Sequence, residues 1–177
     1  KFDKVDTIYP DVKADHWASG AIAYTTQMGI FEGRPDGTFG PQVNITRAEY
    51  ATIVARYKGI LSGTPRFSDV AGHWAENYIY ACGDTGIVTG YTDGTFKPNN
   101  PIIRAEAVAM TNRMLHRKGD ISFILTHLTP DMIFPDVDSS YWAFDHIYEA
   151  SLTHEYIRNE DESETWIRIL ESGRTKR

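Results

Sequence analysis

The chain has 177 residues, of which 41% are hydrophobic and 24% charged, a composition that supports a folded core and excludes a disordered chain. The formal net charge of −6 argues against nucleic acid and against an anionic membrane as partners. Cys82 is the only cysteine, which excludes an internal disulfide and a zinc site built from cysteines. No apolar run is long enough to predict membrane insertion. The chain begins at Lys1 without an apolar signal core, as expected of a mature or excised segment.

One pattern occurs twice at an offset of 57 residues and begins a third time. Trp17, Gly33 and Arg47 recur as Trp74, Gly90 and Arg104. Residues 134–137 and 141–143 match the opening of the pattern, but no Asp-Gly-Thr-Phe or Arg-Ala-Glu motif follows them. A fixed offset across unrelated residue types indicates duplication, and duplicated units usually pack on one another.

Each copy predicts a helix, a loop and a second helix. Apolar residues at near-helical spacing predict first helices over 17–29, 74–86 and 142–152, the first two closed by glycine. Loops rich in glycine, proline and Asp-Gly follow at 31–44 and 88–101. Second helices begin at Thr46 and Ile103.

The second helices differ in how they begin. Thr46 and Glu49 form a capping box, whereas Ile103 offers no side-chain cap, at a cost of about 1 kcal/mol. The connector 117–133 contains residues 121–128, which predict one or two extra helical turns. The tail from His154 lacks the Arg-Ala-Glu motif, so we expect no competent third ligand site even if this tail replaces the missing helix.

The two arginines that start the second helices suit a bound carboxylate. Arg47 and Arg104 would present a planar donor fork beside the free N–H groups and the positive dipole end of a helix. The same residues could instead pair with a carboxylate on the neighbouring unit. Tryptophan rings suit the apolar face of a sugar, although tryptophans at such positions more often belong to the core.

Together these motifs are similar to the S-layer homology family: an Asp-Val and His-Trp-Ala opening, a Gly-Ile-x-x-Gly middle, an Asp-Gly-Thr-Phe-x-Pro loop and an Arg-Ala-Glu helix start. The resemblance implies an all-α fold in which three helix–loop–helix repeats, residues 1–60, 61–119 and 120–177, pack as one pseudo-threefold bundle. It implies an extracellular module of the bacterial cell wall or S-layer that binds secondary cell-wall polysaccharide, often pyruvylated, in grooves between repeats. Other domains of the same surface protein are further expected partners.

On this resemblance Arg47 and Arg104 are the expected carboxylate ligands. The expected groove lining consists of three tryptophans, two glycines, a tyrosine and three aspartates: Trp17, Trp74, Trp142, Gly33, Gly90, Tyr91, Asp11, Asp69 and Asp136. The aspartates precede helices, so their first interpretation is as turn or cap residues.

No motif predicts catalysis, a cofactor or a metal. Each Asp-Gly loop has one aspartate, too few for calcium, and the six histidines show no metal-ligand spacing. Glu49 and Glu106 already have capping roles, so no free carboxylate pair indicates a glycosidase. The alternative to wall anchoring is a protein–protein assembly module of a surface-layer protein, because an incomplete third unit leaves an open edge.

Overall fold

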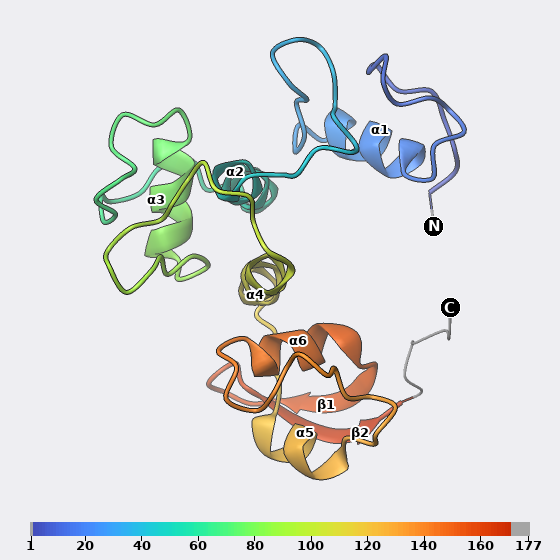
Figure 1. Cartoon of the computed structure of the whole chain (residues 1–177), viewed down its shortest axis with the longest axis vertical. Coiled ribbons are helices and arrows are strands. Elements are labelled where there is room, and N and C mark those ends of the chain that lie inside the picture. Colours follow the sequence, from blue (N-terminus) through green and yellow to red (C-terminus); the bar gives the residue numbers. More distant parts are fainter. Residues whose placement is uncertain (1, 171–177) are drawn as a thin grey trace. The chain divides into compact units, whose positions relative to one another are not determined.

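Residues 2–170 are described by the computed structural model and divide into two units, which meet between Pro101 and Ile102. The N-terminal unit holds α1 (Ser19–Gln27), α2 (Arg47–Lys58) and α3 (Glu76–Asp84). The C-terminal unit holds α4 (Arg104–Met114), α5 (Ile121–His127) and α6 (Phe144–Ser151), followed by β1 (His154–Arg158) and β2 (Glu164–Ile169) (Figure 1). Within residues 2–170, no helix is both long and apolar enough to cross a membrane.

The helices expected from the repeats are confirmed, and so is the extra helix in the connector. The Thr46 N–H donates to Glu49 Oε2 at 2.7 Å, and the Glu49 N–H donates to Thr46 Oγ1 at 3.2 Å, which completes the predicted capping box. At α4 only half of this arrangement exists. The Ile103 N–H donates to Glu106 Oε2 at 3.2 Å, and the isoleucine side chain has no acceptor to offer in return.

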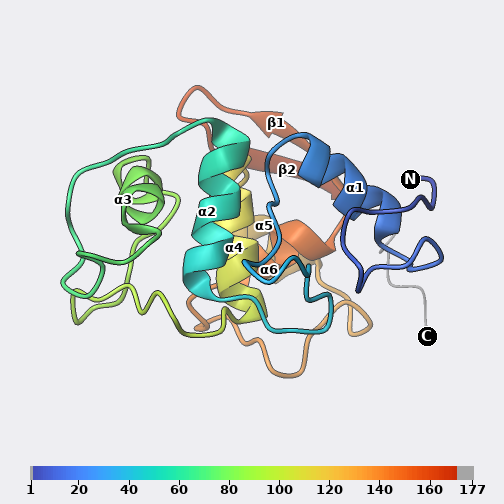
Figure 2. The same cartoon turned by 90° about the horizontal axis from the view of Figure 1, so that it is seen from above.

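The second helix of each repeat packs on the first helix of the next. In the N-terminal unit α2 lies against α3 (Figure 2), and the Cys82 thiol donates to the Ala51 carbonyl at 3.4 Å. In the C-terminal unit α4 lies against α6, and Asn112 Nδ2 donates to the His146 carbonyl at 2.9 Å. Within the described part of the N-terminal unit, α1 and α2 make no such packing contact. Packing therefore runs from one repeat into the following one.

The loop of the second repeat closes the start of α2. The N–H groups of Arg47 and Ala48 donate to the carbonyls of Asn100 and Pro98, each at 2.9 Å. Thr46 and Pro101 also pair as an isolated antiparallel bridge. Helix starts leave backbone N–H groups unsatisfied, and here the neighbouring repeat supplies the acceptors.

Two described clusters of buried apolar side chains lie at the opposite ends of the chain. Tyr9, Val12 and Ile22 bury one face of α1. The core of the C-terminal unit joins α5, α6 and β2 through five buried side chains: Ile124, Phe144, Tyr148, Leu152 and Trp166.

The expected all-α, pseudo-threefold bundle is wrong. Of the helix–loop–helix pattern the third repeat keeps only α6, which comes after the connector helix α5, and β1 and β2 follow α6 as an antiparallel hairpin. The reason is a two-residue alternation in β2, where Glu164 and Trp166 are buried while Thr165 and Ile167 are exposed. Such alternation, rich in β-branched and aromatic residues, favours a strand over a helix. The polar turn between the strands is tight, with Glu162 at a φ of +64°.

Candidate functional site

Each repeat loop is built on an Asp-Gly-Thr turn. Asp36 Oδ1 accepts hydrogen bonds from the Thr38 hydroxyl at 2.6 Å and from the Thr38 N–H at 2.9 Å. Asp93 and Thr95 repeat the pair at 2.6 and 3.0 Å. Hydrogen bonds from the threonine hydroxyls, and then from the backbone N–H groups, lower the pKa of both aspartates. The loops are therefore locally determined structures of the same design.

The carboxylates of Asp11 and Asp69 accept hydrogen bonds from backbone N–H groups of these loops. The Asp11 carboxylate accepts from the N–H groups of Phe39 at 2.9 Å and Gly40 at 2.7 Å, and the Phe39 bond is the main cause of its lowered pKa. Asp69 accepts two backbone bonds of 2.8 Å at the corresponding positions. Each aspartate therefore fastens a loop far along the chain, and neither one caps the helix that follows it. Asp136 is exposed, and the third repeat has no corresponding loop to hold.

Gly33 and Gly90 are required by the loop itself. Their φ angles are +71° and +68°, and a Cβ atom would stand 2.3 Å from the ring of Tyr9 and 2.5 Å from the ring of Phe67. Only glycine fits both the backbone conformation and the ring that covers it. Lining of a ligand groove by these glycines stays a prediction.

The three equivalent tryptophans lie on the surface. Trp17, Trp74 and Trp142 are 84%, 62% and 53% exposed. The first two rings lean on the preceding histidine, and the third leans on Tyr141, with ring centroids between 5.5 and 5.9 Å apart. An exposed tryptophan beside a half-buried ring thus occurs three times, although tryptophan side chains are usually largely buried.

A groove of about 610 Å³ opens in the N-terminal unit between the first repeat's loop, α2 and Trp74. Arg34 and Arg56 line it together with apolar side chains of the loop and helix. Arg56 Nη2 lies 2.6 Å from Glu32 Oε2, so one cation of the groove is already neutralised. A smaller pocket of about 260 Å³ lies beside Trp17. The groove combines apolar walls with a few charged groups, as ligand sites usually do.

Arg47 lies beneath the second repeat's loop. Its side chain is buried, and Nε donates to the Phe96 carbonyl at 2.7 Å. The guanidinium stands 4.7 Å from the Tyr91 ring centroid and 4.6 Å from that of Phe96. Tyr91 also faces Lys97 Nζ at 4.2 Å, so this ring is shared by two cations. Arg47 is therefore fastened to the neighbouring repeat, where its contacts include the Phe96 carbonyl and two rings.

Arg104 occupies the same position of the repeat in a different environment. It is exposed at the start of α4. Among residues 2–170, no hydrogen bond or ion pair of the Arg104 side chain is found, and no carbonyl closes the Arg104 and Ala105 N–H groups as Asn100 and Pro98 close α2. The repeat motif predicts the same role for the two arginines, whereas in the structure the Arg47 side chain is buried and Arg104 is exposed.

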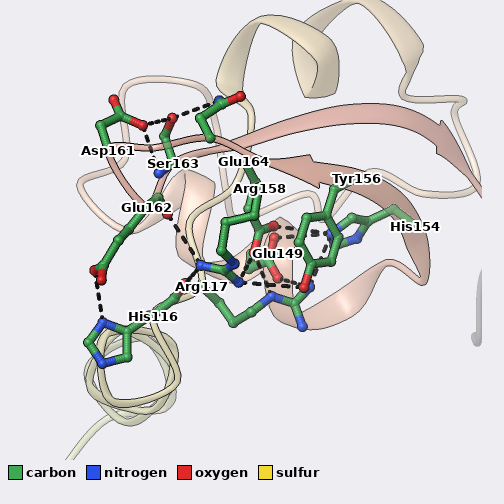
Figure 3. A network of polar contacts seen from close by, with 11 residues as sticks. His116, Arg117, Glu149, His154, Tyr156, Arg158, Asp161, Glu162, Ser163 and Glu164 are labelled. Carbon is green, nitrogen blue, oxygen red and sulfur yellow. Dashed lines mark hydrogen bonds and ion pairs between the residues drawn. The ribbon is translucent and has the colours of Figure 1, made fainter.

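A buried ionic cluster in the C-terminal unit was missed by the sequence analysis. The carboxylates of Glu149 and Glu164 contact Arg117 at 2.5 and 2.8 Å, and Arg158 reaches Glu164 at 3.0 Å (Figure 3). His154 Nε2 lies 3.3 Å from Glu149 Oε2 and 3.5 Å from Glu164 Oε2. Burial, and next the neighbouring Glu164, raise the pKa of Glu149 to about 7.

The reason for missing this cluster is its dependence on the hairpin. Glu149 comes from α6, His154 from β1 and Glu164 from β2, so only the strand pairing brings them together. The available signal was the placement of polar residues on the inward face of an alternating strand. Arg168 and Arg174 are the arginines of the tail that could stand in for the missing Arg-Ala-Glu arginine, although nothing in their spacing supports this role. Arg168 instead makes a bidentate pair with Glu155 at 2.7 and 2.8 Å. Arg174, the other such candidate, lies outside the described residues.

Comparison with protein-family models identifies a matching domain family. The family model of the S-layer homology domain matches residues 8–51 and 66–108, the two complete repeats. The third repeat is not part of either match.

Curated relatives match most of the chain. Cell surface glycoprotein 1 of Acetivibrio thermocellus is 43% identical over 176 residues, covering 92% of this chain and 7% of the relative. The cellulosome-anchoring protein of the same organism is 38% identical over 170 residues, covering 92% of this chain and 36% of the relative. An uncharacterized cell wall amidase of Bacillus anthracis is 34% identical over 116 residues, covering 60% and 21%. The chain thus spans well under two thirds of each of these relatives.

Proposed function

Because the chain belongs to the S-layer homology family through its two matched repeats, we propose that it anchors a larger protein to the bacterial cell wall by binding a secondary wall polysaccharide. The family and the surface relatives indicate a location at the cell surface or cell wall. The relative named as cellulosome-anchoring supports an anchoring role for this chain.

The observation that carries the proposal is the repeated exposure of Trp17, Trp74 and Trp142. A large aromatic ring left in water three times, at the same point of a repeat, needs a partner that covers it. The apolar C–H face of a sugar ring stacks on such a surface, and a polysaccharide offers many such faces in a row. Trp74 also borders the groove of the N-terminal unit, which gives a chain of sugars a place to lie.

In this proposal the arginines bind acidic groups on the polysaccharide, such as a pyruvate ketal. Arg104 is the stronger carboxylate ligand in our proposal because it is exposed beside open helix N–H groups. Arg34 at the groove provides a further cation, whereas Arg56 there is paired with Glu32. Arg47 would have to leave its carbonyl and ring partners to bind a ligand, so we assign it a supporting role.

In this proposal the chain itself binds and does not catalyse. The two acidic residues at the groove already have partners, since Glu32 pairs with Arg56 and Glu49 closes the capping box. A relative that carries an amidase name is compatible with catalysis in another part of a longer protein.

The test is a pull-down with purified cell-wall sacculi before and after chemical removal of the non-peptidoglycan polysaccharide. We expect binding to be lost on removal, and we expect a Trp17→Ala, Trp74→Ala, Trp142→Ala variant to bind untreated sacculi poorly. Tyr57→Ala is the matched control, because Tyr57 is 56% exposed on α2 and does not line the groove.

Two results would contradict the proposal. Binding that survives removal of the polysaccharide would identify peptidoglycan as the ligand. Absence of binding, together with a concentration-dependent dimer or trimer in solution, would favour the assembly module instead.

A further inference from the structure

Three buried side chains of the C-terminal unit turn ligand atoms toward one point. One ligand atom from each of Glu149, His154 and Glu164 lies within 4.8 Å of the other two (Figure 3). Their side chains are 2%, 2% and 0% exposed. Among the described residues, no donor makes a hydrogen bond to Glu149 Oε2 or to Glu164 Oε2. Buried carboxylate oxygens without a donor are costly, so their convergence calls for a ligand.

We propose that Glu149, His154 and Glu164 bind one divalent transition-metal ion, with Zn²⁺ as the ion whose chemistry fits best. The donor set is one imidazole nitrogen and two carboxylate oxygens, without a thiolate. Imidazole favours zinc and its neighbours over magnesium and calcium, which prefer oxygen ligands alone.

The two distances from the imidazole nitrogen agree with a tetrahedral ion. Zinc bonds to nitrogen and oxygen are about 2.0–2.1 Å, which places two ligands of one tetrahedron about 3.3–3.4 Å apart. His154 Nε2 lies 3.3 Å from Glu149 Oε2 and 3.5 Å from Glu164 Oε2. An ion can therefore bridge these atoms with only small side-chain movements.

The imidazole is held in the form that a metal needs. His154 Nδ1 is 2.8 Å from the Leu152 carbonyl, which can only accept, so Nδ1 carries the proton. In the neutral ring Nε2 then keeps its lone pair, directed at the two carboxylates. Stacking on Trp166 at a centroid distance of 3.6 Å fixes the plane of the ring. A hydrogen bond from the non-ligating nitrogen is the usual support of a metal-bound histidine.

The arginines hold the other oxygen of each carboxylate. Arg117 contacts Oε1 of both glutamates at 2.5 and 2.8 Å, and Arg158 contacts Oε1 of Glu164 at 3.0 Å. Each carboxylate thus uses Oε1 for a guanidinium and turns Oε2 inward. Arg117 Nη2 also lies 3.2 Å from His154 Nε2, and an arriving ion would replace this one contact. The alternative to a metal ion is a proton on Nε2. A protonated His154 would form ion pairs with Glu149 and Glu164, and the cluster would then hold no metal.

The test measures Zn²⁺ binding by the full chain. After loading with Zn²⁺ and dialysis, elemental analysis should find about one bound equivalent, and Tm should rise by about 5–10 °C at a 100-fold excess over Kd. In ¹⁵N-histidine NMR, the Nε2 resonance of His154 should shift on addition of the ion while Nδ1 keeps its proton. This NMR measurement needs no substitution.

Two variants sharpen the result. His154→Phe keeps a ring on Trp166 but removes Nε2, and it should lose the bound equivalent. His116→Gln is the control, because His116 is an exposed histidine paired with Glu162 in the same unit and should retain zinc. If His154→Phe does not fold, the NMR titration of the unmodified chain decides. No retained ion and an unmoved Nε2 resonance would overturn the proposal and establish the proton as the occupant.

Discussion

Arg47 donates a hydrogen bond from Nε to the carbonyl of Phe96, 2.7 Å away on the next repeat. The bond crosses from the start of α2 to the end of the following loop, and the rings of Tyr91 and Phe96 flank the guanidinium. One of the two arginines that the sequence marks as carboxylate ligands thus fastens one repeat to its neighbour. Arg104, its counterpart, has no described partner of this kind.

We expect the two arginines to respond differently to truncation. Arg47→Ala should lower the free energy of unfolding by about 2–4 kcal/mol, because it removes a buried charge-assisted hydrogen bond and two cation–π contacts. Arg104→Ala, at an exposed site, should change it by less than about 0.5 kcal/mol and should weaken binding to sacculi. Urea unfolding followed by circular dichroism measures the first effect, and equal stability losses in both variants would contradict it.

The missing cap of α4 offers a stabilising substitution. Ile103→Thr should restore the capping box with Glu106 and raise the free energy of unfolding by about 1 kcal/mol. Ile103 is exposed, so the change sacrifices little apolar burial. Thermal unfolding of this variant beside Thr46→Ala provides the comparison, since the latter removes an intact box and should lose about the same amount. A lower Tm for Ile103→Thr would show that the isoleucine has a packing role.

Acid should weaken the repeat loops. The pKa values of Asp11, Asp36 and Asp93 are lowered by hydrogen bonds that their ionised forms accept more strongly than their neutral forms. A lowered carboxyl pKa adds stability above the ordinary value of about 4, and this contribution disappears as the pH falls through the native pKa. The urea midpoint should therefore drop between about pH 4 and pH 2.

An Asp36→Asn, Asp93→Asn variant tests this origin. Asparagine keeps an oxygen acceptor for the turn but cannot titrate, so the midpoint of this variant should depend less on acid pH than that of the unmodified chain. An unchanged pH dependence would place the acid sensitivity elsewhere.

Cys82 should report on the packing between α2 and α3. Its thiol is fully buried and donates to Ala51, and burial raises its pKa to about 12. A neutral, inaccessible thiol reacts slowly, so a chromogenic disulfide reagent at pH 8 should label the native protein only as fast as the helices separate. In urea the thiol is exposed, so labelling of the unfolded chain should be fast. Rapid labelling of the native chain would mean that α2 and α3 open readily.

The local structure was predictable because its signals are local. The helices and the intact box at Thr46 and Glu49 follow from neighbouring residues. The hairpin was missed because the tail mixes apolar and polar residues in a way that a short sequence window does not resolve. The different environments of Arg47 and Arg104 could not be predicted from the motif, since they depend on whether a further repeat supplies a closing loop.

Packing of α2 on α3, with Thr46 bridged to Pro101, changes what can be treated as a module. A repeat bounded by its sequence motifs separates α2 from α3, although these two helices pack on each other. Residues 46–101 keep both helices together, and their two ends are adjacent in space. Segments with adjacent ends tolerate transplantation and insertion well. An engineer who wishes to lengthen or shorten such an array should therefore copy a segment such as residues 46–101, whose two ends are joined by the bridge, rather than a segment bounded by the sequence motifs.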